Sequence, residues 1–297
     1  MAAADEFLLG VDGGGTRCRA RLARRSGQVL GEGIAGPANL RQGFVEAFGA
    51  VLDATGQCLA AAGLPHTALR ETTACLALAG ASEPDQLAAA RRHPLPFAQA
   101  IIITDAEAAC VGAHGGQDGA VVIIGTGSIG WGIVEGQRHR VGGWGLPVSD
   151  EGSGAWLGRE AIRRVLWAHD GRVEWTPLLD RVFARFDRDA HAIVRWTATA
   201  RPRDYGDIAP LIIQEAGSSD PAAIALARLA AKHIASLVER LDQLGAPRIA
   251  LVGGLAAVLE PYLPTEMRVR LVAPQGDALA GALRRAAEAA PARDAAQ

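Results

Sequence analysis

The chain has 297 residues, 49% of them apolar and 21% charged, with a net charge of −2, and this balance predicts a folded protein with room for two domains. The near-neutral charge gives no basic surface for nucleic acid or an anionic membrane, no apolar run approaches a membrane span, and residues 1–6 lack a signal-peptide pattern. The four cysteines include no C-x-x-C pair. We therefore expect a reduced, cytoplasmic protein whose cysteines are small core residues.

The first half of the chain opens on an apolar strand that runs into an acid and three glycines. We predict further strands near 17–24 and 28–34, a helix over 43–63, a strand at 74–79, a short helix near 83–92, a strand at 101–104 and a small-residue helix from 105. The order is β-β-β-α-β-α-β-α. It ends at the glycine-rich segment 115–119, which we interpret as a hinge.

The second half repeats this opening. We predict strands near 120–125, 129–135 and 137–142, a long helix opened by 149–154, a wholly helical insertion over 171–245, strands at 249–252 and 268–272, and an Ala-rich helix over 278–290 before a frayed tail. Two such units make a duplicated α/β protein with domains at 1–117 and 118–297. We expect a cleft between the halves, at the carboxyl ends of the strands.

Two glycine-rich turns, one in each half, have residues suited to phosphate. In residues 12–16 three glycines leave backbone N–H groups open to an anion, and the carboxylate of Asp12 could hold Mg²⁺ through water. Residues 125–130 spell G-x-G-x-x-G, but the chain continues as a strand where a dinucleotide fingerprint needs a helix. Each turn could be an ordinary hairpin, and a third turn at 253–254 could simply join a strand to a helix. Because a glycine turn after an apolar strand occurs in both halves, we favour phosphate binding for the turns at 12–16 and 125–130.

Several polar residues have two interpretations from the sequence alone. Asp105 follows a buried strand and could be a reacting group or the N-cap of the helix it begins, whereas Glu107 is expected to be solvated. Asp150 could likewise be an N-cap. Asn39 lies in a Gly-Pro turn, where asparagine is common, and Trp144 could be a core residue.

Taken together, these segments resemble the sugar kinase/Hsp70/actin superfamily, and within it the BadF/BadG/BcrA/BcrD-type ATPase family, which includes the N-acetylglucosamine kinases. The resemblance rests on residues 10–16, 104–106, 125–128 and 150–153, which occur in the same order, and it covers nearly the whole chain. It implies duplicated ribonuclease H-like, actin-like ATPase domains. A nucleotide cleft would lie between them, with a helical insertion at about 171–245 in the second.

The resemblance also implies an ATP-dependent hexosamine kinase that uses Mg²⁺, with glucosamine ahead of N-acetylglucosamine as substrate. Asp105 would be the general base and Asp12 would hold the metal. The residues expected to bind ATP are Gly13, Gly14, Gly15, Thr16, Thr126, Gly127, Ser128, Gly253 and Gly254. Those expected to bind the sugar are Asn39, Gly80, Asp105, Trp144 and Asp150.

Two other functions are weighed against the kinase. An ATP-driven activator of the dehydratase-activating type would carry an iron–sulfur cluster on cysteines at a dimer interface, and no paired cysteines support it. A sugar-responsive transcription factor would need a helix-turn-helix segment, for which we expect no room before residue 7. A homodimer is left open. The segment 203–206, Arg-Asp-Tyr-Gly, also belongs to the resemblance, and a dimer contact or a lid are both open for it.

Overall fold

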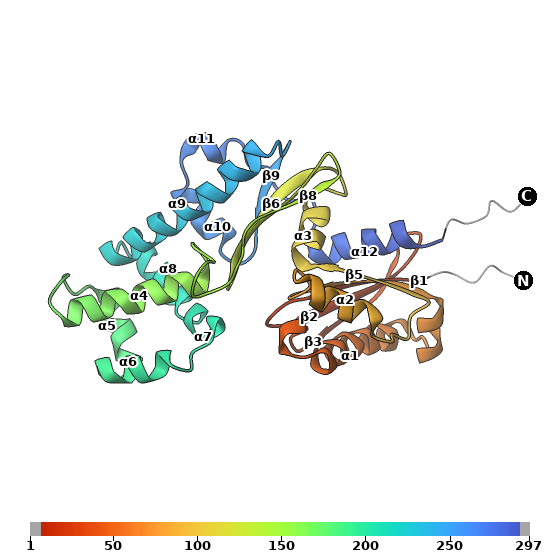
Figure 1. Ribbon diagram of the computed structural model, residues 1–297, viewed down its shortest axis with the longest axis horizontal. Helices are drawn as coiled ribbons and strands as arrows, with labels where there is room; N and C mark the ends of the chain where they lie inside the picture. Colours follow the sequence, from red (N-terminus) through yellow and green to blue (C-terminus); the bar gives the residue numbers. More distant parts are fainter. Residues whose placement is uncertain (1–6, 292–297) are drawn as a thin grey trace, which may run out of the picture. The chain divides into compact units, whose positions relative to one another are not determined.

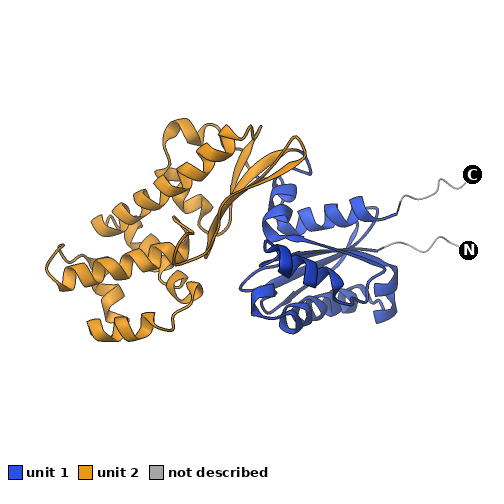
Figure 2. Ribbon diagram, in the orientation of Figure 1, with its two compact units in different colours: residues 1–117, 274–297 blue, residues 118–273 orange. Residues whose placement is uncertain are grey.

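The computed structural model describes residues 7–291 and divides them into two compact units (Figures 1 and 2). Unit 1 contains the chain up to Gln117 and again from Pro274, and unit 2 contains Asp118–Ala273. The expectations for residues 1–6 and for the tail after Pro291 lie outside the described residues.

Unit 1 is built on a five-stranded sheet in the order β3-β2-β1-β4-β5. Its strands are β1 (Phe7–Gly13), β2 (Cys18–Arg24), β3 (Val29–Ala35), β4 (Thr72–Leu78) and β5 (Gln99–Thr104). The first three form an antiparallel meander, and β4 and β5 run parallel to β1. Gly13 pairs with Leu78, and Leu78 with Thr104, so the carboxyl ends of the three parallel strands meet at one edge of the sheet.

Helices cover both faces of this sheet (Figure 1). Side chains alternate along β1, so that Leu9 packs with α1 (Phe44–Ala62) on one face and Leu8 packs with α3 (Asp105–Ala113) and α12 (Ala278–Ala289) on the other. The shorter helices are η1 (Leu40–Gln42), η2 (His66–Glu71) and α2 (Pro84–Arg92).

The final helix α12 belongs to unit 1, which corrects the domain predicted over 118–297. A Cβ at Gly281 would lie 1.9 Å from the carbonyl oxygen of Ala108, so α12 crosses α3 with almost no space between the backbones. Beside this crossing Arg285 donates to Glu107 at 3.1 Å. Glu107 is only 5% exposed, so the expectation that it is solvated was wrong.

Unit 2 repeats the start of unit 1 in a sheet ordered β8-β7-β6-β9. Its strands are β6 (Gly119–Ile124), β7 (Ser128–Val134), β8 (Gln137–Gly142) and β9 (Ile249–Val252). The strand predicted at 268–272 is absent: the segment forms α11 (Thr265–Arg268) and a single bridge from Leu271 to Ile249. Within the segment, the N–H groups of residues 269–271 donate to carbonyls of Thr265, Met267 and Arg268, so they cannot pair with β9.

The predicted helical insertion is confirmed. It follows α4 (Gly154–His169) and consists of α5 (Pro177–Ala184), α6 (Ala190–Thr197), α7 (Pro202–Gly206), α8 (Ala209–Gly217) and α9 (Pro221–Gln243). After β9 come α10 (Ala256–Leu259) and η3 (Glu260–Tyr262). By length and composition α9 is apolar enough to cross a membrane, but Leu226, Ile234 and Leu241 are buried in the core of unit 2. We therefore interpret α9 as a core helix.

Candidate functional site

The glycine turn after β1 is held from behind by the main chain. The carbonyl of Gly13 accepts from Ala79 N–H at 2.7 Å, and that of Gly14 accepts from Ala38 N–H at 3.0 Å. A Cβ at Gly13 would lie 2.6 Å from the Leu78 side chain and 2.9 Å from the Ala38 Cβ, so a larger residue would have to displace these neighbours. Gly15 beyond it is exposed. We call residues 13–16 turn one.

Asp12 lies just before turn one and pairs with Arg19 across β1 and β2. Arg19 donates to one oxygen of Asp12, Oδ2, from Nε at 3.2 Å and from Nη2 at 2.7 Å. Its third nitrogen, Nη1, donates at 2.8 Å to Asp277, which caps α12 by accepting from Ala280 N–H. Arg19 thus ties Asp12 to the start of α12.

Asp105 is the first residue of α3 and is half-buried. The cap of this helix is Thr104, whose hydroxyl accepts from Glu107 N–H at 3.0 Å, so Asp105 is not the N-cap. Burial raises the pKa of the Asp105 carboxyl above its usual value, and the negative charge of Asp12 adds to this, while the Ala106 N–H and Arg41 act against it. The two predicted site acids of unit 1, Asp12 and Asp105, therefore lie close enough for their charges to interact.

Asn39 and Gly80 lie beside turn one. Asn39 bridges to Ala79, and its side-chain oxygen accepts from Arg41 N–H at 3.0 Å. Gly80 has a φ of 84°, and a Cβ there would lie 2.9 Å from that oxygen. The amide nitrogen of Asn39 lies 3.8 Å from where a Cβ on Gly15 would be. These predicted site residues of unit 1 form one cluster with Asp12 and Asp105.

The second glycine turn follows β6 in unit 2, and we call residues 125–128 turn two. The first free N–H groups of α4 hold it: Gly154 donates to the carbonyl of Gly125 at 2.8 Å, and Ala155 to that of Thr126 at 3.1 Å. The Ser128 hydroxyl donates to the Glu151 carbonyl at 2.8 Å. Thr126 itself is exposed.

Asp150 reaches turn two from the segment before α4. Its oxygen Oδ2 lies 2.7 Å from where a Cβ on Gly127 would be, and Oδ1 accepts from Gly145 N–H at 3.1 Å. The N-cap of α4 is Ser153, which accepts from Trp156 N–H, so Asp150 does not cap the helix. Burial raises the pKa of the Asp150 carboxyl, and the charge of Glu151 adds to this, against the hydrogen bond from Gly145.

Trp144 is not a core residue, since it is 67% exposed. The guanidinium of Arg140 lies 4.0 Å from the centre of its ring. The Trp144 N–H donates to the Ser149 hydroxyl at 3.3 Å. The Arg140 guanidinium therefore packs on the indole, while much of the residue faces solvent.

Gly253 and Gly254 lie against the end of β6. Gly253 has a φ of 99°, and a Cβ there would lie 2.5 Å from the carbonyl oxygen of Ile124. A Cβ at Gly254 would meet nothing within 4 Å. The Leu255 side chain lies 3.5 Å from the Cβ position of Gly154, so this turn borders turn two.

The sequence did not predict an apolar pocket of about 340 Å³ next to this turn. Its walls come from α4, α8, α9, α10 and η3, and include Leu157, Ile212, Ala216, Ala257, Leu259 and Tyr262. Ala257 lies shortly after Gly254 in the sequence, so the predicted turn at 253–254 could have indicated where this wall of the pocket lies. The wall from α8 is set only by tertiary packing.

The segment 203–206 lies against turn two, which the sequence also did not predict. Gly206 approaches Thr126, whose Cγ2 is 3.5 Å from the Cβ position of the glycine. A Cβ on Gly158 of α4 would lie 2.0 Å from the carbonyl oxygen of Tyr205. The Tyr205 ring packs edge-on against Trp196, with centroids 4.8 Å apart. The short helix α7 thus packs on α4 and borders turn two.

Comparisons with known proteins identify one family and several related kinases. The model of the BadF/BadG/BcrA/BcrD ATPase family matches residues 9–283. Glucosamine kinase GspK of Vibrio cholerae is 41% identical over 277 residues, which are 93% of this chain and 94% of that protein. N-acetylmuramic acid/N-acetylglucosamine kinase of Clostridium acetobutylicum is 33% identical over 178 residues, 58% of each chain.

A solved structure described as a candidate N-acetylglucosamine kinase from Chromobacterium violaceum superposes with a TM-score of 0.90 at 37% identity. The match covers 96% of this chain and all of the other. The duplicated actin-like ATPase fold expected from the sequence is thereby confirmed.

Proposed function

The chain belongs to the BadF/BadG/BcrA/BcrD ATPase family, and from this premise we propose that it is an ATP-dependent kinase that converts glucosamine to glucosamine 6-phosphate. The observation that carries the proposal is the position of Asp105. Thr104 caps the helix, so the Asp105 carboxylate is not used as its N-cap, and it lies with Asp12 at the carboxyl edge of the sheet. The relation to glucosamine kinase GspK supports glucosamine as the sugar, and N-acetylglucosamine is the next candidate.

In this proposal the backbone N–H groups of Gly13, Gly14, Gly15 and Thr16, and those of Thr126, Gly127 and Ser128, bind the phosphates of ATP. Gly253 and Gly254 let the nucleoside approach the main chain, and the apolar pocket beside them takes the adenine ring.

Asp12 fits a role in holding Mg²⁺. Both bonds from Arg19 end on Oδ2, and Oδ1 accepts no hydrogen bond from the described residues. A carboxylate oxygen of this kind suits Mg²⁺, most often through a bound water. When bound, the ion would neutralise charge on the phosphates.

Asp105 acts as the general base. It takes the proton of the sugar 6-hydroxyl as that oxygen bonds to the γ-phosphorus of ATP, and the bond from this phosphorus to the bridging oxygen breaks to release ADP. A raised pKa makes the carboxylate a stronger base. Asn39, Gly80, Trp144 and Asp150 bind the sugar, and the Asp150 carboxylate suits the cationic amine of glucosamine.

The second candidate, an ATPase activator without a sugar substrate, is disfavoured by the cysteines. Burial is complete for all four thiols, and no disulfide joins them in the described structure (Cys18, Cys58, Cys75 and Cys110). Ligands of a cluster shared at a dimer interface would have to reach the surface. Four buried thiols without a disulfide also support our proposal that the protein works in the cytoplasm.

The test is ADP release from Mg·ATP with glucosamine, N-acetylglucosamine, glucose or no sugar. We expect release that depends on an amino sugar and is fastest with glucosamine. A rate that is equal with and without sugar would refute the kinase and favour the activator. A rate that is higher with N-acetylglucosamine would keep the kinase but change its substrate.

A further inference from the structure

The segment 143–150 joins β8 to α4 and carries both Trp144 and Asp150. Its backbone is unusual, with positive φ at Gly143 (71°), Gly145 (95°) and Asp150 (65°). Glycine adopts this conformation without cost, but an aspartate does so only where its surroundings enforce it. Contacts from residues outside the segment must therefore stabilise this backbone conformation.

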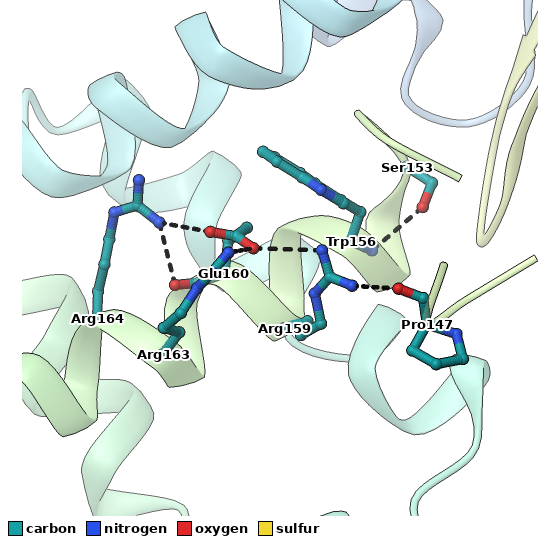
Figure 3. Close-up of polar contacts among 7 residues, drawn as sticks. All are labelled: Pro147, Ser153, Trp156, Arg159, Glu160, Arg163 and Arg164. Carbon is teal, nitrogen blue, oxygen red and sulfur yellow. Dashed lines mark hydrogen bonds and ion pairs between the residues drawn. The ribbon is translucent and has the colours of Figure 1, made fainter. Parts of the chain in front are cut away.

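Arg159 supplies such support from α4. Its Nη1 donates at 2.6 Å to the carbonyl oxygen of Pro147, in the middle of the segment (Figure 3). The bond from a charged guanidinium to a carbonyl is stronger than one between neutral groups. At the start of the segment Arg140 acts similarly, with bonds to the carbonyls of Gly142 and Gly143.

Glu160 orients Arg159. Its side chain is only 4% exposed and binds three guanidinium groups: Arg159 at 3.4 Å, Arg164 at 3.2 Å, and Arg163. Figure 3 shows the Arg159 guanidinium between the Glu160 carboxylate and the Pro147 carbonyl. A buried carboxylate must remain paired, and here Arg163 and Arg164 would still pair it if Arg159 were lost.

We propose that Arg159 is a positioning residue for the sugar: by holding Pro147 it keeps the segment 143–150 in the conformation that presents Trp144 and Asp150. This inference rests on the proposed function, since it assumes that these two residues bind the amino sugar. Arg163 offers a matched comparison. It binds the same Glu160 from the same helix, but no hydrogen bond joins it to the segment 143–150 in the described structure.

The experiment compares Arg159→Met, Arg159→Lys and Arg163→Met in the full chain. We expect Arg159→Met to raise the KM for glucosamine about tenfold while the KM for ATP stays within about twofold, because the lost charged hydrogen bond ends on Pro147 in the sugar-binding segment and on neither glycine turn. Arg159→Lys keeps a donor and should recover most of the affinity for glucosamine. Arg163→Met should leave both KM values within about twofold.

Thermal unfolding of the three variants separates positioning from stability. Arg159→Met and Arg163→Met each remove one partner of Glu160, so if loss of stability alone raised the KM for glucosamine, each variant would raise it in proportion to its Tm loss. The inference is overturned if the two variants raise the KM for glucosamine equally, if Arg159→Met raises the KM for ATP as much, or if Arg159→Lys behaves like Arg159→Met. Absence of sugar-dependent ADP release from the wild type would instead refute the proposed function.

Discussion

The two units build the same turn after their first strand but support it differently. In unit 1 the carbonyl of Gly13 accepts from the N–H of Ala79, just beyond β4. The carbonyl of Gly14 accepts from the N–H of Ala38, just before η1. Turn one is therefore held by main-chain hydrogen bonds at the edge of the sheet. Its geometry depends on the same core that holds Asp105.

In unit 2 the carbonyls of Gly125 and Thr126 bond instead to the start of α4, at Gly154 and Ala155. Helix α4 in turn packs against the insertion, and Gly206 of α7 borders Thr126. Turn two therefore depends on helices outside the sheet. The comparison suggests that substitutions in unit 1 act on chemistry and stability together, whereas those in the helices of unit 2 act on binding with less loss of stability.

The largest effect is expected at the base. Asp105→Asn should lower kcat at least about 100-fold, because no group remains to take the hydroxyl proton, with ATP affinity unchanged. In unit 2, Asp150→Asn should mainly raise the KM for glucosamine. Steady-state ADP release and nucleotide titration measure both. Asp105→Asn with more than about a tenth of the wild-type kcat would contradict the assignment of the base.

A large loss of stability is expected at the crossing of α3 and α12 in unit 1. Gly281→Ala would place a methyl group 1.9 Å from a carbonyl oxygen, and such overpacking should lower the free energy of unfolding by about 1–3 kcal/mol. Urea unfolding measures the change. Gly49→Ala is the control: its Cβ meets nothing within 4 Å in the middle of α1, so it should stabilise by about 0.5–1 kcal/mol. Equal stability of the two variants would show that the crossing tolerates a methyl group.

The sequence predicted the meanders, both glycine turns and the position of Asp105, because local patterns determine them. It could not decide which residue caps α3 or α4, since Thr104 and Asp105, or Asp150 and Ser153, lie close together and suit the role equally well.

Long-range packing accounts for the remaining differences. An Ala-rich helix such as α12 does not reveal in its own sequence which unit it covers. The alternating charged and apolar residues at 268–272 resemble a strand, but the N–H groups of residues 269–271 are already bonded to carbonyls of the preceding turn. The proximity of Gly206 to Thr126 depends on Gly158 and the rest of the insertion, which no local pattern shows.

A smaller effect is expected where α7 packs on α4. Gly158→Ala would push α7 away, because the new methyl group would meet the Tyr205 carbonyl at 2.0 Å. Since Gly206 borders Thr126, we expect the KM for ATP to rise about threefold, with a smaller loss of stability than for Gly281→Ala. Kinetics with varied ATP and urea unfolding test this. An unchanged KM for ATP would show that turn two does not depend on α7.

The smallest effect concerns the stability of unit 1 itself. Burial raises the pKa of Asp105, so the folded protein keeps this proton at pH values where the unfolded chain has released it, and stability falls as pH rises through that window. Above that window the carboxyl is ionised in both states, and the wild type bears the full cost of the buried charge. Asp105→Asn removes the charge and can keep the hydrogen bond from the Ala106 N–H. Its Tm should therefore exceed that of the wild type above this window, and the difference should vanish below the ordinary aspartate pKa of 3.8. If Asp105→Asn proved both less active and less stable than the wild type above this window, the Asp105 carboxylate would stabilise the fold. The expectation that the site keeps its base at a cost in stability would then be wrong.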